Sequence, residues 1–458
     1  MLGFETIGSA IVIAHDGAPV LTTDPWINED AYFGSWGHDY EIPPEPRESI
    51  RRAKFHFFSH GHPDHLNIRS LPELSGGTFL IADHYGGRLK HDLEAQGYAV
   101  RVLKDFEWVT LSPRIKVMAI ANANQDSCLL IDVGGHLVVN LNDAPDLGWS
   151  RAIRKIAKRY AHSYLLMLTG WSGADMANFF REDGTRLYGA DQFRHPIAPR
   201  YQASALRFGA RAVIPFSSFH RYQRTDSIWA NELVPALADY HAGASASGTP
   251  ILPAFVRVDA ETGAITPLDP PLAQRPVLAP EAFGDSWSDP MDTHDRNRLD
   301  AYFKAKQVLA DSFGFVRVRM GGGAHTIDLN RNLKDKGITF EAPRASLMTA
   351  IEHEVFDDML IGNFMKTTLH GVESLYPEFS PVVAKYADNG RAQTRAELKA
   401  YFRHYRHRDP LGYWFSWAEK TSENVFRRAV PEDSALFRSA KKFYYASLGV
   451  ARPRATKT

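Results

Sequence analysis

Short apolar runs separated by turn residues fill the first 220 positions of the chain. Runs of this length that are rich in Val, Ile and Leu are typical of strands. Gly134-Gly135 stands between two of them and predicts a β-hairpin. Helical periodicity lies between other runs, so we expect a mixed α/β region with polar side chains at strand ends. The predicted strands are 7–13, 18–22, 54–58, 78–81, 99–103, 107–111, 115–121, 128–133, 136–140, 164–168 and 212–216, and the predicted helices are 87–96, 150–161 and 199–208.

The pattern changes after residue 265. Prolines at 267, 270, 271, 276 and 280 fall in a stretch without periodicity, which is typical of a linker or an extended surface segment. We therefore expect an α/β domain over 1–265, a proline-rich linker over 266–290 and a helical, α+β region over 291–458. In that last region the predicted helices are 293–313, 345–358, 374–387, 394–405 and 433–446, and the predicted strands are 315–320 and 326–329.

Composition limits the class of protein. The chain has 458 residues, is 44% hydrophobic and has equal numbers of acidic and basic side chains, so it can bury a large core. Its zero net charge gives no reason to expect a nucleic acid or a membrane surface as partner. No apolar run is long enough to span a bilayer. Cys128 is the only cysteine, which excludes a disulfide within this chain and is typical of a cytoplasmic protein.

The most informative segment follows the predicted strand 54–58. It reads His60-Gly61-His62-Pro63-Asp64-His65. Imidazole is the commonest metal ligand in proteins, and carboxylate accompanies it around borderline metals. His60 and His62 are two residues apart, so in extended backbone their side chains point the same way. Asp64 and His65 follow where the chain turns and can face a second ion. The segment therefore predicts a metal site at a strand end.

The segment has the H-x-H-x-D-H form, and it resembles the metallo-β-lactamase superfamily. Further segments, in the same order and spacing, resemble the family of CMP-N-acetylneuraminate hydroxylase and, more loosely, the metallo-β-lactamase-fold diiron hydroxylases. They are 23–27, 126–130, 171–175, 284–287 and 360–364. The resemblance implies an α/β fold, an αββα sandwich, with two metal ions at one edge between the sheets. The hydroxylase family carries a Rieske domain, which binds an iron–sulfur cluster through cysteines and histidines. This chain has a single cysteine and lacks the cysteines for such a cluster.

The resemblance also implies a ligand set, and one position departs from it. Asp143 follows the strand 136–140 and matches the bridging aspartate, while His220 matches the last histidine. Where the family has a middle histidine, the sequence reads Asn122-Ala-Asn124-Gln125-Asp126. Asn122 is aligned with that histidine, as a ligand or as a partner of metal-bound water. The expected ligands are His60, His62, Asp64, His65, Asn122, Asp143 and His220, with Asp24 orienting a histidine and Trp26, Trp171 and Ser172 in contact with substrate.

Two reactions fit this site. A dinuclear zinc hydrolase would attack an ester, thioester, amide or phosphodiester with a metal-activated water that Asp64 steers. A diiron monooxygenase would use O₂ to hydroxylate a C–H bond of a small organic substrate, with electrons from an external donor. The resemblance, the oxygen donors around Asn122 and the nearby aromatic residues favour two iron ions and hydroxylation, with Asp64 and Asp143 as catalytic residues. A third hypothesis is a non-catalytic binding protein with a decayed site, which would hold no stoichiometric metal.

Overall fold

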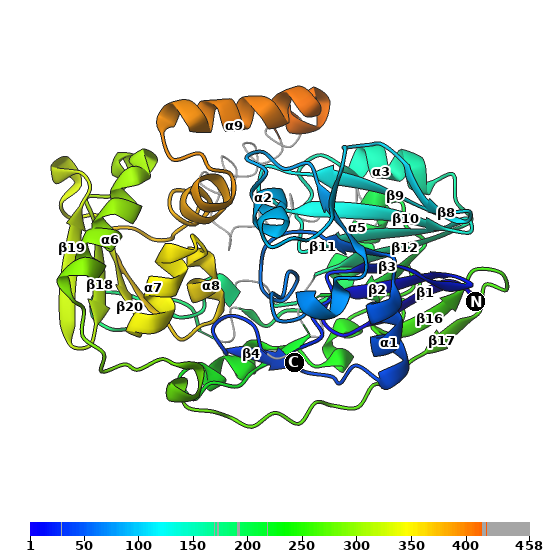
Figure 1. Ribbon diagram of the computed structural model, residues 1–458, viewed down its shortest axis with the longest axis horizontal. Coiled ribbons are helices and arrows are strands. Elements are labelled where there is room, and N and C mark those ends of the chain that lie inside the picture. The colour runs from blue at the N-terminus through cyan, green and yellow to red at the C-terminus, as the bar shows by residue number, and fades with distance from the viewer. Residues whose placement is uncertain are drawn as a thin grey trace, which may run out of the picture.

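The computed structural model describes residues 1–28, 30–168, 170–171, 174–189, 193–217, 219–414 and 418. Two large sheets make up the first part of the chain (Figure 1). The eight-stranded sheet is parallel from β3 to β7 and antiparallel elsewhere. Its order is β17 (Ile265–Pro267), β16 (Val256–Asp259), β1 (Leu2–Ile7), β2 (Ile11–Asp16), β3 (Ala18–Thr23), β5 (Phe55–Phe58), β6 (Thr78–Ala82) and β7 (Val100–Leu103).

The second sheet has six strands. Its middle is the antiparallel meander β9–β10–β11, whose predicted hairpin at Gly134-Gly135 is confirmed. β12 and β14 then add in parallel beside β11. The order is β14 (Ala212–Pro215), β12 (His162–Met167), β11 (His136–Asn142), β10 (Ser127–Val133), β9 (Ile115–Ala121) and β8 (Val109–Ser112).

The two sheets pack face to face because their strands alternate between two apolar surfaces. Leu129 and Ile131 of β10 point into a core shared with Phe4 of β1 and Leu80 of β6. Leu130, on the opposite face of β10, packs with the helices outside. Those outer helices are α1 (Pro44–Arg52) and α2 (Arg88–Ala95) on the first sheet and α3 (Ser150–Ala157) and α5 (Ala198–Phe208) on the second. The predicted α/β fold, an αββα sandwich, is confirmed.

A smaller five-stranded sheet with helices follows, drawn at the left of Figure 1. One of its edge strands, β13 (Phe179–Phe180), comes from the first part of the chain and pairs in parallel with β21. The others, in order, are β21 (Lys366–His370), β20 (Gly337–Glu341), β18 (Phe315–Met320) and β19 (Gly323–Asp328). The helices are α6 (Thr293–Ala305), α7 (Arg344–Glu352), α8 (Phe356–Ile361), a π-helix (Pro381–Asn389) and α9 (Arg395–Arg408).

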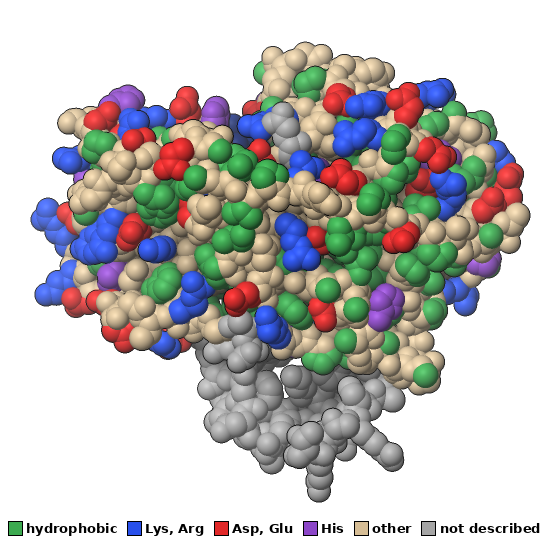
Figure 2. Space-filling view, turned by 90° about the horizontal axis from the view of Figure 1, so that it is seen from below, with side chains coloured by type: hydrophobic (Ala, Val, Ile, Leu, Met, Phe, Trp, Pro, Cys, Tyr) green, Lys and Arg blue, Asp and Glu red, His purple; other side chains and the backbone are tan. Residues whose placement is uncertain are grey.

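Short elements connect these layers. β4 (Trp36–His38) and β15 (His220–Tyr222) form a two-stranded sheet. The 3₁₀ helices are Leu71–Leu74, Ala174–Met176, Ile228–Leu233, Leu237–Tyr240, Pro280–Phe283, Gln307–Asp311 and Arg331–Leu333. None of the described helices has the length and apolar character needed to cross a bilayer. The face in Figure 2 carries acidic and basic side chains interspersed, as the zero net charge suggests.

Several predicted elements need correction. The single strand predicted over 7–13 is wrong, because Gly8 has a φ of +61° and a turn separates β1 from β2. The helix predicted over 345–358 is two helices, α7 and α8, since Glu354 has a φ of +53°. The helix predicted over 293–313 ends at Ala305 and resumes as a 3₁₀ helix, and 374–387 becomes helical only at Pro381. The helix predicted over 433–446 lies outside the described residues.

Candidate metal centre

The histidine-rich segment lies at the carboxyl end of β5, between the parallel strands β3 and β6. Its start is fixed by Asp24, at the end of β3. One carboxylate oxygen of Asp24, Oδ1, accepts hydrogen bonds from the backbone N–H of Ser59 at 2.7 Å and from its hydroxyl at 3.0 Å. The hydroxyl of Ser59 also lies 2.9 Å from Nδ1 of His60. Asp24 is therefore connected to His60 through Ser59, and its orienting role stays a prediction.

Asp143 reaches this segment from the other sheet. It follows β11, where Asn142 has a φ of +57°. The side-chain amide of Asn142 donates to the hydroxyl of Ser59 at 2.9 Å and also to Asp24, which ties the end of β11 to the end of β5. The hydroxyl of Ser217 donates to Oδ1 of Asp143. The structure thus brings together two parts of the predicted site that lie far apart in the sequence.

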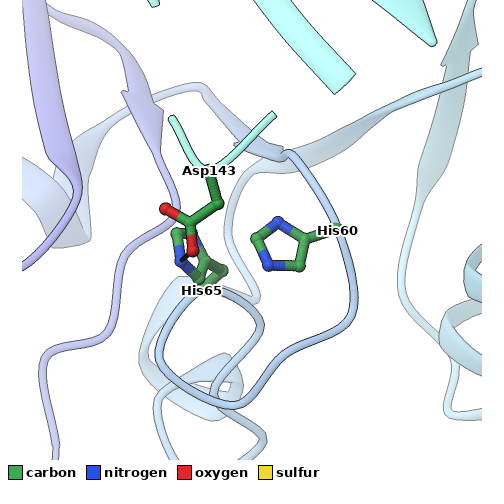
Figure 3. Close-up of side chains that lie close together, drawn as sticks. All are labelled: His60, His65 and Asp143. Atoms are coloured by element: carbon green, nitrogen blue, oxygen red, sulfur yellow. Dashed lines mark ion pairs between the residues drawn. The ribbon is translucent and has the colours of Figure 1, made fainter. Parts of the chain in front are cut away.

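His60, His65 and Asp143 form a first group of ligand atoms, which lie within 4.8 Å of one another. In Figure 3 the carboxylate of Asp143 lies against the ring of His65, with the ring of His60 beside them. Nε2 of His65 is 3.3 Å from Oδ2 of Asp143 and 3.3 Å from Oδ2 of Asp64. Both ring nitrogens of His65 and Oδ2 of Asp64 are buried without a hydrogen-bonding partner. Buried polar atoms of this kind need a partner, and a cation fits them.

A second group combines His62 with two side chains that the sequence analysis missed, Asp357 and Asp358 of α8. Nε2 of His62 lies 2.8 Å from Oδ2 of Asp357, and Nδ1 of His62 lies 2.9 Å from Nε2 of His60. The two groups are therefore joined through the pair of histidines. No sequence pattern indicates this role for Asp357 and Asp358, because acidic residues in the first turn of a helix are common for reasons of helix stability.

The charges of the two groups shift their pKa values strongly. Burial disfavours a charged His65 ring, but the carboxylates of Asp64 and Asp143 outweigh it and raise the pKa of His65 well above its usual value. Burial would raise the pKa of Asp64, yet the neighbouring charge of His65 and the hydrogen bond from Tyr32 lower it to about 2. The hydroxyl of Tyr32 donates to Oδ1 of Asp64 at 2.5 Å. Asp64 is thus held as a carboxylate in a buried place.

In the second group, burial and neighbouring charges again shift the pKa values in opposite directions, and the ammonium of Lys385 is an additional charge. Burial and the ammonium of Lys385 lower the pKa of His62, but Asp357 and Asp358 outweigh them and raise it. Burial and the neighbouring charge of Asp357 raise the pKa of Asp358 well above its usual value. Lys385, on the π-helix, lies 3.6 Å from Asp357 and 4.0 Å from Asp126. The carboxylates around His62 therefore favour positive charge at this second group.

Asn122 was expected beside the metal ions, but its side chain binds its own loop. Oδ1 of Asn122 accepts the backbone N–H groups of Asn124 at 2.7 Å and of Asp126 at 3.3 Å, so this side chain holds its own loop. Asp126 faces a cavity that also borders His62 and Asp143, whereas Asn122 borders a different one. Burial raises the pKa of Asp126, and Lys385 and His62 oppose the rise. Asp126 therefore lies nearer to the ligand groups than Asn122 does.

The cavity has a volume of about 370 Å³ and joins the two parts of the chain. Of the predicted residues, His62, Asp143, Trp171 and His220 border it. His220 stacks on the Trp36 ring at 3.3 Å between centroids, because β15 pairs with β4. It belongs to neither group of ligand atoms.

The predicted substrate contacts have mixed outcomes. Trp26 is fully buried and stacks on His38 at 4.0 Å, and it does not border the cavity. Trp171 does border it. Ser172 lies outside the described residues. The aromatic side chains that border the cavity are Tyr32, Trp36, Trp171, Phe193, Tyr222, Tyr240 and Tyr376.

Comparison with known proteins supports the resemblance that the motifs indicate. No family model matches the chain. Cytidine monophosphate-N-acetylneuraminic acid hydroxylase of Asterias rubens is 27% identical over 136 residues, which are 28% of this chain and 21% of that protein. The enzyme of the same name from Danio rerio is 25% identical over 129 residues, 26% of this chain and 22% of that protein. The match thus spans about a fifth of the length of these relatives.

Solved structures of low similarity include both hydroxylases and hydrolases. CmlA, a diiron beta-hydroxylase from Streptomyces venezuelae, is 15% identical with a TM-score of 0.35, over 56% of this chain and 53% of CmlA. An isothiocyanate hydrolase from Delia radicum gut bacteria is 13% identical with a TM-score of 0.37, over 59% of this chain and 99% of that one. Igni18, a metallo hydrolase from Ignicoccus hospitalis, is 15% identical with a TM-score of 0.31, over 47% of this chain and 82% of that one.

Proposed function

We propose that this protein is a dinuclear, metal-dependent monooxygenase that hydroxylates a C–H bond of a small organic substrate. The observation that carries the proposal is the pair of ligand groups, His60–His65–Asp143 and His62–Asp357–Asp358, which are joined through His60 and His62 beside one cavity. Imidazole and carboxylate ligands suit iron as well as zinc. Two bound iron ions would supply the electron transfer to O₂ on which hydroxylation depends.

Oxygen donors favour iron and hydroxylation over zinc and hydrolysis. Where the family has a middle histidine, the side chains that border the cavity here are the amide of Asn124 and the carboxylate of Asp126. Carboxylates also dominate the second ligand group, through Asp357 and Asp358. Harder oxygen ligands of this kind suit iron and other harder ions better than a histidine-rich set does. The similarity to hydroxylases over about 130–140 residues supports the same choice.

The cavity supports a substrate with an apolar or amphipathic part. Its wall is rich in aromatic side chains, and its polar groups are concentrated at the metal side, around Asp143 and Lys385. Sites for small organic ligands commonly combine an apolar wall with a few placed polar groups. A nucleotide sugar or a natural-product precursor has this mixed character. We expect such a compound, and no nucleic acid or membrane, as the partner.

The reaction balances with an external reductant. Substrate C–H, O₂, two electrons and two protons give the hydroxylated product and one water. The single cysteine cannot supply the thiolates of an iron–sulfur cluster, so we propose a separate electron donor. This reductant-dependent chemistry suits the cytoplasmic location predicted from the cysteine content.

The chain's own residues would prepare the site. Asp24 and Ser59 orient the ring of His60 through the contacts described above. Tyr32 stabilises the ionised form of Asp64 by donating a hydrogen bond from its hydroxyl, and Ser217 fixes one oxygen of Asp143 in the same way. Lys385 balances the negative charge of Asp126 and Asp357 at the cavity wall. Ligands held by neighbours in this way keep their orientation when a metal binds.

Hydrolysis by two zinc ions is the second candidate. It is favoured by the H-x-H-x-D-H segment and by Asp64, whose lowered pKa leaves it a carboxylate able to accept a hydrogen bond from water and so orient it. In that case the metals would lower the pKa of a bound water, and the cavity would hold an ester, thioester, amide or phosphodiester.

Metal loading and O₂ consumption test the proposal. The purified protein is loaded with Fe²⁺ without air or with Zn²⁺, desalted and analysed for metal. We expect two iron ions per chain and reductant-driven O₂ uptake by the iron form, which Asp143→Ala abolishes while leaving the circular dichroism spectrum unchanged. Stoichiometric zinc with turnover of a hydrolysable ester and no O₂ uptake would establish the second candidate. Absence of stoichiometric metal would instead favour the non-catalytic binding protein.

A further inference from the structure

Helix α8 presents its acidic first turn to the histidine segment. It begins at Phe356, two residues after Glu354, whose φ of +53° turns the chain between α7 and α8. After this turn Asp357 borders the cavity, and Asp358 lies behind it, near His62. The ligand atoms of Asp357, Asp358 and His62 lie within 4.8 Å of one another, and all three side chains are buried or nearly so.

Asp358 is the unusual member of this group. It is only 7% exposed, and its carboxylate makes no hydrogen bond or ion pair with any of the residues that the structure describes. A buried carboxylate without a partner is costly, and proteins almost always pair such a group with a cation or with hydrogen-bond donors. Asp357 differs, because His62 and Lys385 lie 2.8 Å and 3.6 Å from it. The unpaired carboxylate therefore points to a ligand beside His62.

The charge balance of the cavity points the same way. Four carboxylates border it, those of Asp126, Asp143, Asp175 and Asp357, and Lys385 is the only Lys or Arg among its described lining residues. Asp64 and Asp358 add two more buried carboxylates next to this wall. One ammonium cannot balance these six carboxylates. The raised pKa values of His62 and His65 show that protons on these rings supply further positive charge, and a divalent ion in each ligand group would replace those protons and cancel most of the remaining negative charge.

The surroundings hold α8 in place for such a role. Phe356 is buried against Phe340 of β20 at 4.9 Å between ring centroids. Arg88 of α2 donates to the backbone carbonyls of His353 and Glu354, just before α8, at 2.5 Å and 2.8 Å. The helix is thus fixed both to its own sheet and to the first part of the chain. Ligands on rigid supports of this kind bind metals with defined geometry.

We propose that Asp357 and Asp358 are metal ligands which, with His62, hold one of the two metal ions, so that the second part of the chain completes the dinuclear centre. This inference rests on the proposed function for the existence of two ions, but it adds to His62 two ligands, Asp357 and Asp358, that lie outside the H-x-H-x-D-H segment and its sandwich. The other ion belongs to His60, His65 and Asp143. The donors from α8 make up for the absent middle histidine at 122.

Metal stoichiometry tests the assignment. The wild-type protein, Asp357→Asn/Asp358→Asn and the control Glu352→Gln/Glu354→Gln are each loaded with Co²⁺, desalted and analysed for metal. The control removes the same charge from the same stretch, where Glu352 and Glu354 pair with Arg298 and Arg391 instead. We expect two ions per chain in the wild-type protein and in the control. We expect one ion in the aspartate variant, with loss of the magnetic coupling between the two Co²⁺ ions.

A measurement on the wild-type protein covers the case in which the aspartate variant does not fold. Crystals of the Co²⁺ form should show two anomalous peaks, one of them within bonding distance of Asp357 or Asp358. Two ions retained by a folded aspartate variant, or two peaks that both lie away from α8, would overturn the inference and leave the proposed function standing. A wild-type protein that binds no Co²⁺ would overturn both.

Discussion

Asn122 shows, at the level of a single residue, how a sequence position and a structural role can separate. It is aligned with the family's histidine, but its carbonyl oxygen holds the backbone of residues 124 and 126. Asp126 faces the cavity from the same loop. The alignment compares positions along the sequence, whereas the turn formed by residues 122–125 determines which side chains of this loop reach the cavity.

Substituting the two residues separates their roles. Asn122→Ala leaves two buried backbone donors without a partner, so we expect it to lower the free energy of unfolding by about 1–3 kcal/mol and to leave the metal content unchanged. Asp126→Asn removes a negative charge beside His62, so we expect it to weaken metal binding with little effect on stability. Urea unfolding and metal titration measure the two effects. An exchange of the two outcomes would restore Asn122 as the ligand.

Tyr32 determines the ionisation of Asp64 through one short hydrogen bond. Tyr32→Phe removes a donor to the charged carboxylate, so the pKa of Asp64 should rise from its present value of about 2. A folded-state pKa below the unfolded value of about 4 contributes stability above pH 4 that is lost as the pH falls through 2. We therefore expect a loss of about 1–3 kcal/mol at neutral pH.

Acid unfolding of the metal-free protein checks this expectation, and its midpoint should move to higher pH in Tyr32→Phe. Tyr98→Phe is the matched control, since the Tyr98 ring stacks on Phe79 and its hydroxyl makes no hydrogen bond with the described residues. Equal acid midpoints in the two variants would show that Tyr32 does not act on Asp64.

At the scale of elements, the sequence predicted the central strands well and the second part of the chain less well. The strand predicted over 115–121 matches β9, because its alternating apolar positions face two different cores. The break between α7 and α8 was missed, since a non-glycine residue at positive φ leaves no sequence signal. Asp357 and Asp358 follow that break and lie beside His62, so the sequence analysis missed the turn and the proposed ligands for the same reason.

Arg88 connects α2 to the helices of the second part of the chain through hydrogen bonds. Its guanidinium contacts the carbonyls of His353, Glu354 and Asp388. Arg88→Ala should lower the free energy of unfolding by about 2–3 kcal/mol, because charge-assisted hydrogen bonds to half-buried carbonyls are lost. It should also weaken binding of the ion assigned to α8.

Arg114→Ala is the control for Arg88, since Arg114 forms exposed ion pairs with Asp16 and Glu261. Screened surface pairs contribute little, so we expect a much smaller loss of stability and unchanged metal binding. Chemical denaturation and calorimetric Co²⁺ titration compare the two variants. Equal losses in both would argue against a specific link at Arg88.

On the scale of the whole molecule, the two parts are joined by a shared sheet and a shared cavity. The family resemblance implied the sandwich, while the local pattern of an apolar run followed by polar residues predicted the H-x-H-x-D-H segment at a strand end. The sequence could not predict that β13 pairs with β21, since a two-residue strand has no recognisable period. It also could not predict that α8 lies against His62, because nothing local encodes a contact between residues almost 300 positions apart.

Phe179 tests how strongly this shared sheet couples the two parts. Its side chain is 1% exposed and packs in the core of the second part, although it belongs to the first part by sequence. Phe179→Ala should cost about 3–5 kcal/mol, as for other buried phenylalanines. Phe180→Ala is the control, because Phe180 is only half-buried. We expect the wild-type protein to unfold in one transition by both calorimetry and tryptophan fluorescence, and Phe179→Ala to separate the transitions.

Strand β13, which the first part of the chain contributes to the smaller sheet, also determines how the second part would behave as an isolated fragment. β13 covers one edge of the smaller sheet, next to β21. A fragment that begins after the proline-rich stretch would leave the backbone N–H and C=O groups of β21 open to solvent, and an open edge recruits strands from other molecules. Such a fragment should therefore self-associate in solution, and adding a short peptide with the sequence around Phe179-Phe180 should suppress that association.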